Sequence, residues 1–261
     1  MCGIVGYVGP DRALPIVMAG LQRLEYRGYD SAGVALLDGA GGVRVERRAG
    51  RIENLEKRLD TLEPAARLGS TGIGHTRWAT HGRPTDRNAH PHLDCSGAVA
   101  VIHNGIIENF APLRAELEAA GHELRSETDT EVVAHLLEGE LSASGGATPD
   151  LAGALRTVCR RLHGAFTLVV VHRDRPDVVV GARRNSPLVL GVGDGEMFLA
   201  SDVAAFIAHT RDAVELGQDQ VVELRRDSYE ITDFSGAAVT GSGFHVDWDL
   251  SAAEKDRKSV V

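Results

Sequence analysis

The 261-residue sequence contains only three cysteines and no long hydrophobic stretch. Cys2, Cys95 and Cys159 are an odd number at unrelated spacings, which excludes a disulfide framework and indicates a reducing, cytoplasmic compartment. No apolar run approaches the ~20 residues that a membrane-spanning helix needs. The N-terminus also lacks the basic and apolar regions of a secretory signal. We therefore expect a cytoplasmic protein with no membrane partner.

Positive charge is also scarce. The chain has 28 lysines and arginines against 37 aspartates and glutamates, which gives a formal net charge of −9. This balance argues against nucleic acid or an anionic membrane surface as the main partner. Hydrophobic residues make up 43% of the chain and charged residues 25%, so the composition is that of a globular protein large enough to bury a sizeable core.

Short apolar segments alternate with amphipathic ones along the chain. Segments with the character of strands are 3–9, 33–38, 43–48, 72–77, 97–104, 166–172, 177–183, 187–192, 196–201, 220–225 and 229–232. Helices are predicted, mostly from apolar residues at helical spacing, at 13–24, 52–62, 109–120, 126–141, 150–162 and 202–208. Closely spaced turns favour antiparallel pairing. The pattern predicts an α+β fold with layered antiparallel sheets, and 142–149 is the one candidate linker.

The second residue has the chemistry of a self-sufficient nucleophile. Cysteine is small, so removal of Met1 is expected, and Cys2 then carries a thiol and a free α-amine on one residue. An α-amine with a pKa of ~7.7–8.0 can take the proton of the thiol directly or through one water, so no histidine base is needed. Taken alone, a small residue at position 2 means little, and its meaning depends on the rest of the chain.

The densest polar segment extends from residue 75 to residue 104. Its polar and aromatic residues are His75, Thr76, Arg77, Trp78, Thr80, His81, Asn88, His90, His92, Cys95, His103 and Asn104. The spacings of its histidines and Cys95 match none of the compact zinc patterns. We therefore predict a hydrogen-bonded active-site loop without a metal.

Three further features supply what the hydrolysis of an amino-acid side-chain amide requires. Arg77 can hold a carboxylate in bidentate fashion, and Asp129 can hold an ammonium group. Asn104 and Gly105 can form an oxyanion hole. Each has a simpler alternative. Arg77 could be a surface arginine, Asp129 could only complement a helix dipole, and Asn104-Gly105 could be a hairpin turn. Together with Cys2, the set indicates an amidase.

Six motifs resemble the glutaminase domains of the glucosamine-6-phosphate synthase family, the glutamine–fructose-6-phosphate aminotransferases. These domains are class II glutamine amidotransferases of the N-terminal nucleophile hydrolase type. The motifs lie at 2–6, 24–33, 75–82, 88–92, 103–109 and 126–131. They are long and specific, and the resemblance extends from residue 2 to about residue 240.

This resemblance implies a four-layer αββα sandwich with two antiparallel sheets, L-glutamine as the substrate, and no cofactor. By motif position, the catalytic residues are Cys2, Asn104 and Gly105. The residues that would bind or enclose the substrate are Arg77, Trp78, Thr80, His81, Asp129 and Arg27. His90 also falls in a motif, but no chemical step is assigned to it.

The family has two sugar-isomerase domains, which bind fructose 6-phosphate and accept the ammonia, and these are absent from the 261 residues. We expect residues 1–245 to form the glutaminase domain. Residues 246–261 should be a tail that either frays or was added to a truncated natural chain. The domain should make glutamate and ammonia from glutamine but not glucosamine 6-phosphate by itself. The full-length family enzyme is expected to be a homo-oligomer.

Three alternatives stay open at this point. The glutaminase half of amidophosphoribosyltransferase shares the Cys-Gly start, but it usually has Gln where this chain has Tyr29. A glutamine-sensing module would keep the pocket without turning the substrate over. A zinc-dependent hydrolase would use the histidines of the 75–104 segment.

Overall fold

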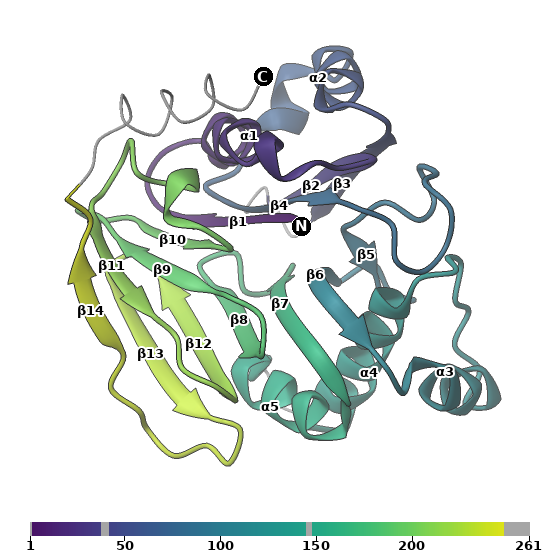
Figure 1. Ribbon diagram of the computed structural model, residues 1–261. Coiled ribbons are helices and arrows are strands. Elements are labelled where there is room, and N and C mark those ends of the chain that lie inside the picture. Colours follow the sequence, from purple (N-terminus) through teal and green to yellow (C-terminus); the bar gives the residue numbers. More distant parts are fainter. Residues whose placement is uncertain (1, 38–41, 145–147, 248–261) are drawn as a thin grey trace.

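Two antiparallel sheets stack face to face, and helices cover their outer faces (Figure 1). The computed structural model describes residues 2–37, 42–144 and 148–247. The order of layers is helix, sheet, sheet, helix, which confirms the predicted αββα sandwich. No helix among these described residues is both long and apolar enough to cross a membrane.

The first sheet has eight strands, with the N-terminal strand near its centre. In spatial order they are β14 (Ser242–His245), β11 (Asp212–Glu215), β9 (Val189–Val192), β10 (Met197–Ala200), β1 (Gly3–Val8), β4 (Thr71–Arg77), β2 (Ser31–Leu37) and β3 (Val43–Ala49). Helices α1 (Ala13–Arg23) and α2 (Ile52–Asp60) cover its outer face. Because β1 pairs with β10 on one side and β4 on the other, the residue before it is held firmly at the start of a central strand.

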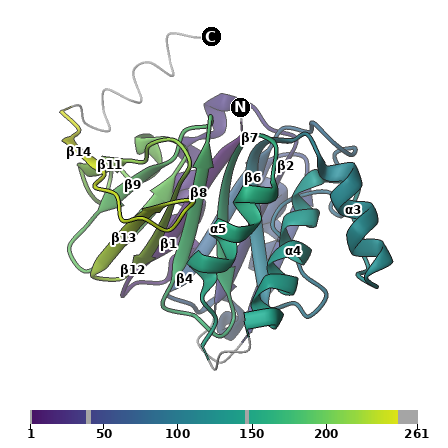
Figure 2. The same ribbon diagram turned by 90° about the horizontal axis from the view of Figure 1, so that it is seen from below.

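The second sheet has six strands. In spatial order they are β13 (Ser228–Asp233), β12 (Gln220–Arg225), β8 (Val179–Arg184), β7 (Gly164–His172), β6 (Val99–Ile107) and β5 (His92–Leu93). Helices α4 (Asp129–Ser144) and α5 (Leu151–Arg161) lie across its outer face, with α3 (Phe110–Ala119) beside α4 (Figure 2). Short 3-10 turns complete the chain: η1 (Glu25–Arg27), η2 (Pro64–Arg67) and η3 (Val203–Ala205).

Three apolar layers hold the sandwich together. One lies between the sheets and includes Ile4, Ile102 and Leu199, all fully buried. The other two pack α1 and α2, or α4 and α5, against their sheets. Burial of such side chains stabilises the fold by roughly 1.5–3 kcal/mol each. The strands that end at the edge of this core are therefore rigid supports for polar side chains.

Helix α4 begins at Asp129, three residues later than predicted, because the residues before it form its cap. The Thr128 hydroxyl accepts a hydrogen bond from the Glu131 amide at 3.4 Å. The Glu131 carboxylate reaches back to the amides of Arg125 (2.8 Å) and Ser126 (2.5 Å) instead of to Thr128. The capping box that Thr128 and Glu131 could form is thus only half formed, and the carboxylate stabilises the incoming loop.

Other differences concern short elements. Strands β5, β11 and β14 were not predicted, and the predicted helix at 202–208 is the 3-10 turn η3. Two expectations fall partly outside the described residues: the linker at 142–149 and the tail at 246–261. Removal of Met1 is also untested, because residue 1 is not described.

Candidate active site

Cys2 directly precedes β1 and is partly exposed. The two residues that follow Cys2 are held by side chains of other strands and loops: the Gly3 amide donates to Thr76 Oγ1 (3.0 Å), and the Ile4 amide donates to Ser201 Oγ (3.1 Å). The Cys2 Sγ accepts a hydrogen bond from the Trp78 amide at 3.1 Å. The strand register therefore places the thiol in one position at the start of the central strand β1.

Burial raises the pKa of the Cys2 thiol, although the Trp78 amide and the Arg77 charge oppose this effect. The resting thiol is therefore protonated at neutral pH and needs a base. In the described part of the chain, the hydrogen bonds of Cys2 Sγ go to the Trp78 main chain and to no histidine or carboxylate. A base on the cysteine itself would meet this need.

A cavity of about 370 Å³ opens beside Cys2. Eight of the nine site residues expected from the sequence line it: Cys2, Arg27, Arg77, Trp78, Thr80, Asn104, Gly105 and Asp129. They come from both sheets and from α4, and they bring a thiol, a guanidinium, an amide and a carboxylate together. The volume is in the range of small-molecule sites.

Asn104 and Gly105 lie inside β6, paired with Thr167 and Phe166 of β7, so the hairpin-turn alternative is wrong. The Asn104 Nδ2 donates to the Cys2 carbonyl at 3.0 Å. Gly105 has a φ of +124°, and a Cβ there would lie 2.0 Å from the Ala165 carbonyl oxygen. No other residue fits this position without moving the strand.

His75 orients the Asn104 amide. Its Nε2 lies 2.8 Å from Asn104 Oδ1. Burial lowers the pKa of His75 to about 3, so the ring is neutral, and because Oδ1 only accepts, Nε2 carries the proton. This contact turns the Asn104 amino group toward Cys2. Sequence reasoning noted His75 in the polar segment but gave it no part in the site.

Arg77 is the last residue of β4 and is only 3% exposed. Its Nη2 donates to the carbonyls of His81 and Gly82, the second at 3.1 Å. Its Nη1 is buried and has no hydrogen-bond partner among the described residues. A buried cation with a free donor in a cavity is a site for an anionic group of a ligand.

Asp129 begins α4 and is 3% exposed. Its Oδ2 accepts a hydrogen bond from the Ile107 amide at 2.9 Å and lies 3.9 Å from His103 Nδ1. The N-terminus of α4 stabilises the negative charge of Asp129. This interaction with the helix dipole is compatible with a role of the same carboxylate in binding a ligand. The cavity thus contains one buried cation and one buried anion.

The loop after β4 partly encloses the cavity. Trp78 is 57% exposed, and Thr80 lines the cavity. His81 does not line it, because its ring packs edge-on against Phe110 at a centroid distance of 4.8 Å and only its carbonyl contacts Arg77. Its contact with substrate stays a prediction.

Arg27 contacts the main chain of the nucleophile. It donates to the Cys2 carbonyl at 3.4 Å and to Ser201 Oγ at 2.8 Å, and it forms an ion pair with Asp202 at 3.7 Å. It therefore fixes the residue that carries the thiol. A direct contact between Arg27 and substrate stays a prediction.

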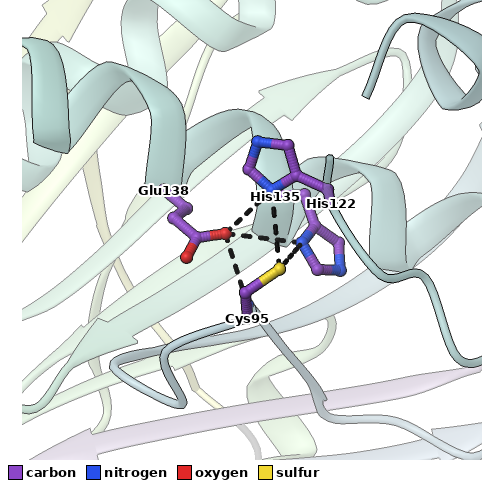
Figure 3. A group of neighbouring side chains, drawn as sticks. All are labelled: Cys95, His122, His135 and Glu138. Atoms are coloured by element: carbon purple, nitrogen blue, oxygen red, sulfur yellow. Dashed lines mark hydrogen bonds and ion pairs between the residues drawn. The ribbon is translucent and has the colours of Figure 1, made fainter. Parts of the chain in front are cut away.

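The loop histidines pack as buried neutral rings. His90 stacks on His75 with a centroid distance of 4.4 Å and meets His92 edge-on at 5.0 Å. Burial lowers the pKa of His92 to about 3 and that of His90 well below its usual value. Cys95 lies instead among His122, His135 and Glu138, the one group in the described residues with metal-ligand spacing (Figure 3). Among the described residues, the histidines of the 75–104 segment are thus not grouped with the spacing of metal ligands.

Residues 75–208, more than half of the chain, match the family model described as "Glutamine amidotransferase domain". This stretch includes Arg77, Asn104 and Asp129 of the cavity. The chain belongs to this family. The antiparallel sandwich is thus that of an amidotransferase domain.

Two relatives of this amidotransferase domain carry the same name. A protein of Streptomyces coelicolor named "Glutamine--fructose-6-phosphate aminotransferase [isomerizing]" is 72% identical over 256 residues, which are 98% of this chain and 40% of the relative. A protein of the same name from Mycolicibacterium smegmatis is 61% identical over 98% of this chain and 42% of its own length. The family resemblance is confirmed, and the domain spans about two fifths of these relatives.

Solved structures support the fold of the domain. The glutamine phosphoribosylpyrophosphate amidotransferase of B. subtilis has a TM-score of 0.73 at 24% identity, over 91% of this chain and 50% of that one. A glutamine aminotransferase class-II domain protein from Silicibacter pomeroyi has a TM-score of 0.58 at 18% identity, over 89% of this chain and 99% of that one. At these identities the likeness shows the sandwich alone.

Proposed function

We propose that this amidotransferase domain hydrolyses L-glutamine to L-glutamate and ammonia through a thioester on Cys2. The proposal rests above all on one observation: the thiol shares a cavity with the buried guanidinium of Arg77 and the carboxylate of Asp129. The names of the relatives support glutamine as the amide donor.

Binding depends on the two buried charges. The Arg77 guanidinium would hold the α-carboxylate of glutamine, and Asp129 would hold its α-ammonium group. Both ends of the amino acid are then fixed, so the side-chain amide is presented to Cys2 in one orientation. Trp78, Thr80 and His81 would enclose the substrate from the loop, and Arg27 would keep the nucleophile in place.

Acylation begins with proton transfer from the Cys2 thiol to its own α-amine, after removal of Met1. The thiolate attacks the amide carbon, and the carbonyl oxygen becomes an oxyanion that accepts hydrogen bonds from Asn104 Nδ2 and the Gly105 amide. When the intermediate collapses, the C–N bond breaks and the α-ammonium returns its proton to the leaving nitrogen. Ammonia leaves, and a glutamyl thioester remains on Cys2.

Deacylation repeats these steps with water. The α-amine takes a proton from the water as it attacks the thioester, and the same oxyanion donors stabilise the second tetrahedral intermediate. Cleavage of the C–S bond returns the proton to the thiolate and releases glutamate. Every group in the cycle except the water belongs to the domain.

The longer relatives suggest where the ammonia goes. We infer a cytoplasmic glutamine–fructose-6-phosphate aminotransferase in which residues 1–245 form the glutaminase domain. Sugar-isomerase domains would there bind fructose 6-phosphate and accept the ammonia to give glucosamine 6-phosphate. The full enzyme would be a homo-oligomer, as in the resembling family.

The test compares the domain with its Cys2→Ala and Cys2→Ser variants. Release of glutamate and ammonia should be lost in both, while glutamine still binds in calorimetry, because the charges of Arg77 and Asp129 remain. A glutamine-sensing module would instead bind glutamine without turnover even in the unsubstituted protein. Full turnover in Cys2→Ala would overturn the proposal.

A further inference from the structure

Four side chains that the amidase chemistry does not use converge outside the active-site cavity (Figure 3). Cys95 lies in the turn between β5 and β6, His122 follows α3, and His135 and Glu138 are one turn apart on α4. Each offers one atom, and these atoms all lie within 4.8 Å of one another. We propose that Cys95, His122, His135 and Glu138 form a structural binding site for a zinc ion.

Four of the six distances among the donor atoms are close to those of a tetrahedral zinc site, and the other two are no longer than 4.8 Å. Cys95 Sγ lies 3.6 Å from His122 Nδ1 and 3.4 Å from His135 Nδ1. Glu138 Oε2 lies 3.0 Å and 3.5 Å from the same two nitrogens. Zinc bonds of ~2.3 Å to sulfur and ~2.0–2.1 Å to nitrogen and oxygen give tetrahedral edges of about 3.6 Å and about 3.3 Å. An ion therefore fits with only small shifts of the side chains.

The ligand types favour zinc among divalent metals. One thiolate, two imidazoles and one carboxylate are a borderline-soft set, whereas Mg²⁺ and Ca²⁺ prefer oxygen ligands alone. Four protein ligands fill a tetrahedron and leave no open position for a substrate, as in structural zinc sites. Cys95 is exposed, so an ion has a path to the site, while His135 is buried.

A second layer of contacts supports one of the ligands. When Nδ1 of His135 binds a metal, Nε2 carries the ring proton, and it is buried without a hydrogen-bond partner among the described residues. The Glu131 carboxylate lies 3.9 Å from this nitrogen on the same helix face, which is longer than a hydrogen bond, and a small shift of either side chain would let it accept one. Metal-bound histidines commonly face a carboxylate in this way.

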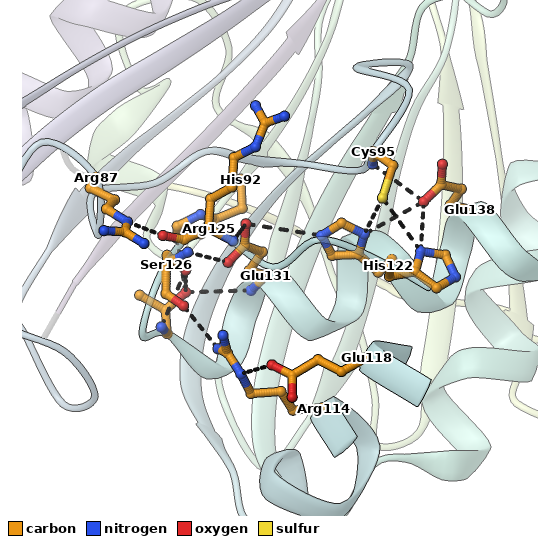
Figure 4. A network of polar contacts seen from close by, with 12 residues as sticks. Arg87, His92, Cys95, Arg114, Glu118, His122, Arg125, Ser126, Glu131 and Glu138 are labelled. Carbon is orange, nitrogen blue, oxygen red and sulfur yellow. Dashed lines mark hydrogen bonds and ion pairs between the residues drawn. The ribbon is translucent and has the colours of Figure 1, made fainter. Parts of the chain in front are cut away.

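The zinc site would join three segments that also shape the active site. Figure 4 shows the polar network from the cluster through Glu131 to the loop at Arg125 and Ser126. That loop leads into Asp129, the buried anion of the cavity. The cluster and the cavity share no lining residue, so we infer a role in holding α4 and its loop, not in the chemistry.

The metal-free alternative is a network of hydrogen bonds in which the thiol and both imidazoles contact the Glu138 carboxylate.

The experiment uses Cys2→Ala as the parent protein, so that the N-terminal thiol and amine cannot chelate the ion. Zinc content per chain is measured after dialysis against zinc and then against buffer. Co²⁺ is then titrated, with absorption followed in the thiolate charge-transfer and d–d regions, and thermal unfolding is recorded with and without EDTA.

We expect one zinc per chain, a tetrahedral Co²⁺ spectrum with a thiolate band, and a lower melting temperature in EDTA. Adding Cys95→Ser should remove the thiolate band, and either Cys95→Ser or Glu138→Gln should weaken zinc binding by about 100-fold or more. The matched control is His245→Ala, which removes an exposed histidine 2.8 Å from Asp212 on β11 and should change nothing.

Three results would overturn the site. These are less than about 0.1 zinc per chain in the parent, an octahedral Co²⁺ spectrum, and unchanged affinity in the Cys95→Ser and Glu138→Gln variants. Cys95 is exposed and both replacements are nearly isosteric, so the variants should fold, and circular dichroism checks that they do. None of these readouts depends on glutamine hydrolysis. A negative result for the zinc site would therefore leave the proposed glutaminase function untouched, and the reverse also holds.

Discussion

Cys2 and Cys95 carry the same thiol in opposite surroundings. The Cys2 Sγ accepts a main-chain amide hydrogen bond, and its cavity holds groups that stabilise negative charge, such as Arg77 and the Asn104 amide. The Cys95 Sγ lies within 3.6 Å of two imidazole nitrogens and belongs to a cluster with a carboxylate. The first setting suits attack on an amide carbon, and the second suits a cation.

The comparison shows that the neighbours of a thiol decide its chemistry. Cys159 completes the set, since it is fully buried in the apolar layer under α5, and burial raises the pKa of its thiol far above the usual value. Cys159 is therefore neither a nucleophile nor a metal ligand. Each prediction below separates the cavity of Cys2 from the cluster of Cys95.

The largest expected effect is that of Cys2→Ala on turnover. Loss of the nucleophile should lower kcat for glutamine hydrolysis by about 10³-fold or more, because no other described group in the cavity can form the thioester. Cys2→Ala should still bind one zinc per chain. Steady-state ammonia release and zinc analysis of one preparation of this variant check both statements, and failure of Cys2→Ala to bind zinc would contradict a site built by Cys95, His122, His135 and Glu138 alone.

Acid should destabilise the fold through the buried histidines around the cavity. Burial lowers the pKa of His75 and His92 to about 3 and also lowers those of His90 and His103. The unfolded chain binds these protons near pH 6.5 and the folded chain does not, so stability is fully present above pH 6.5 and is lost as the pH falls toward 3. At pH 5 the slope from the three most strongly shifted histidines, His75, His90 and His92, approaches about 4 kcal/mol per pH unit.

Urea unfolding at pH 7, 6 and 5 measures this slope. Each series is run in EDTA and again with zinc, because acid also displaces metal from cysteine and histidine ligands. The slope in EDTA should persist in Cys95→Ser. A free energy of unfolding that stays flat from pH 7 to pH 5 would contradict neutral buried imidazoles.

Asp129→Asn should weaken glutamine binding without affecting zinc. The amide still accepts a hydrogen bond from Ile107, so α4 keeps its start, but the charge facing the substrate ammonium is lost. Hydrogen bonds to charged groups contribute about 1.5–3 kcal/mol, so kcat/KM should fall by roughly 10- to 100-fold, mostly through KM. An unchanged KM would remove Asp129 from the binding site.

The smallest effect is expected for His75→Phe. The variant keeps a ring against His90 but cannot donate to Asn104 Oδ1, so the amide loses its fixed orientation. We expect kcat to fall about tenfold with KM nearly unchanged, and His75→Gln to recover part of the loss. Equal changes in both variants, or a change confined to KM, would argue against this positioning role.

Most of the fold could be predicted because apolar periodicity determines it. Strands such as β1 and β4 are short apolar runs, and the predicted ranges 3–9 and 72–77 match them closely, whereas β6 continues to Ile107, past its predicted end at Asn104. Strand β11 was missed because only its two middle residues are buried, and β14 was missed because it is exposed throughout. The start of α4 was misplaced because side chains before it fold back to cap it, which periodicity does not encode.

The cavity was predictable because its motifs are dense and specific, whereas the zinc cluster was not. Cys95 and His122 lie in separate turns, and only the topology brings them to α4. One signal was visible in advance: His135 and Glu138 are three residues apart, which places both on one face of a helix. Without a partner from elsewhere in the chain, that pair alone indicates no metal.

The most direct test of the central claim is labelling with an electrophilic glutamine analogue, followed by peptide mass spectrometry. All three thiols compete in this experiment, but only that of Cys2 lies in the cavity that would bind the analogue. We predict one adduct per chain, on Cys2, in a chain that lacks Met1, and protection by glutamine. An adduct on Cys95, or on Cys2 with Met1 retained, would contradict the account.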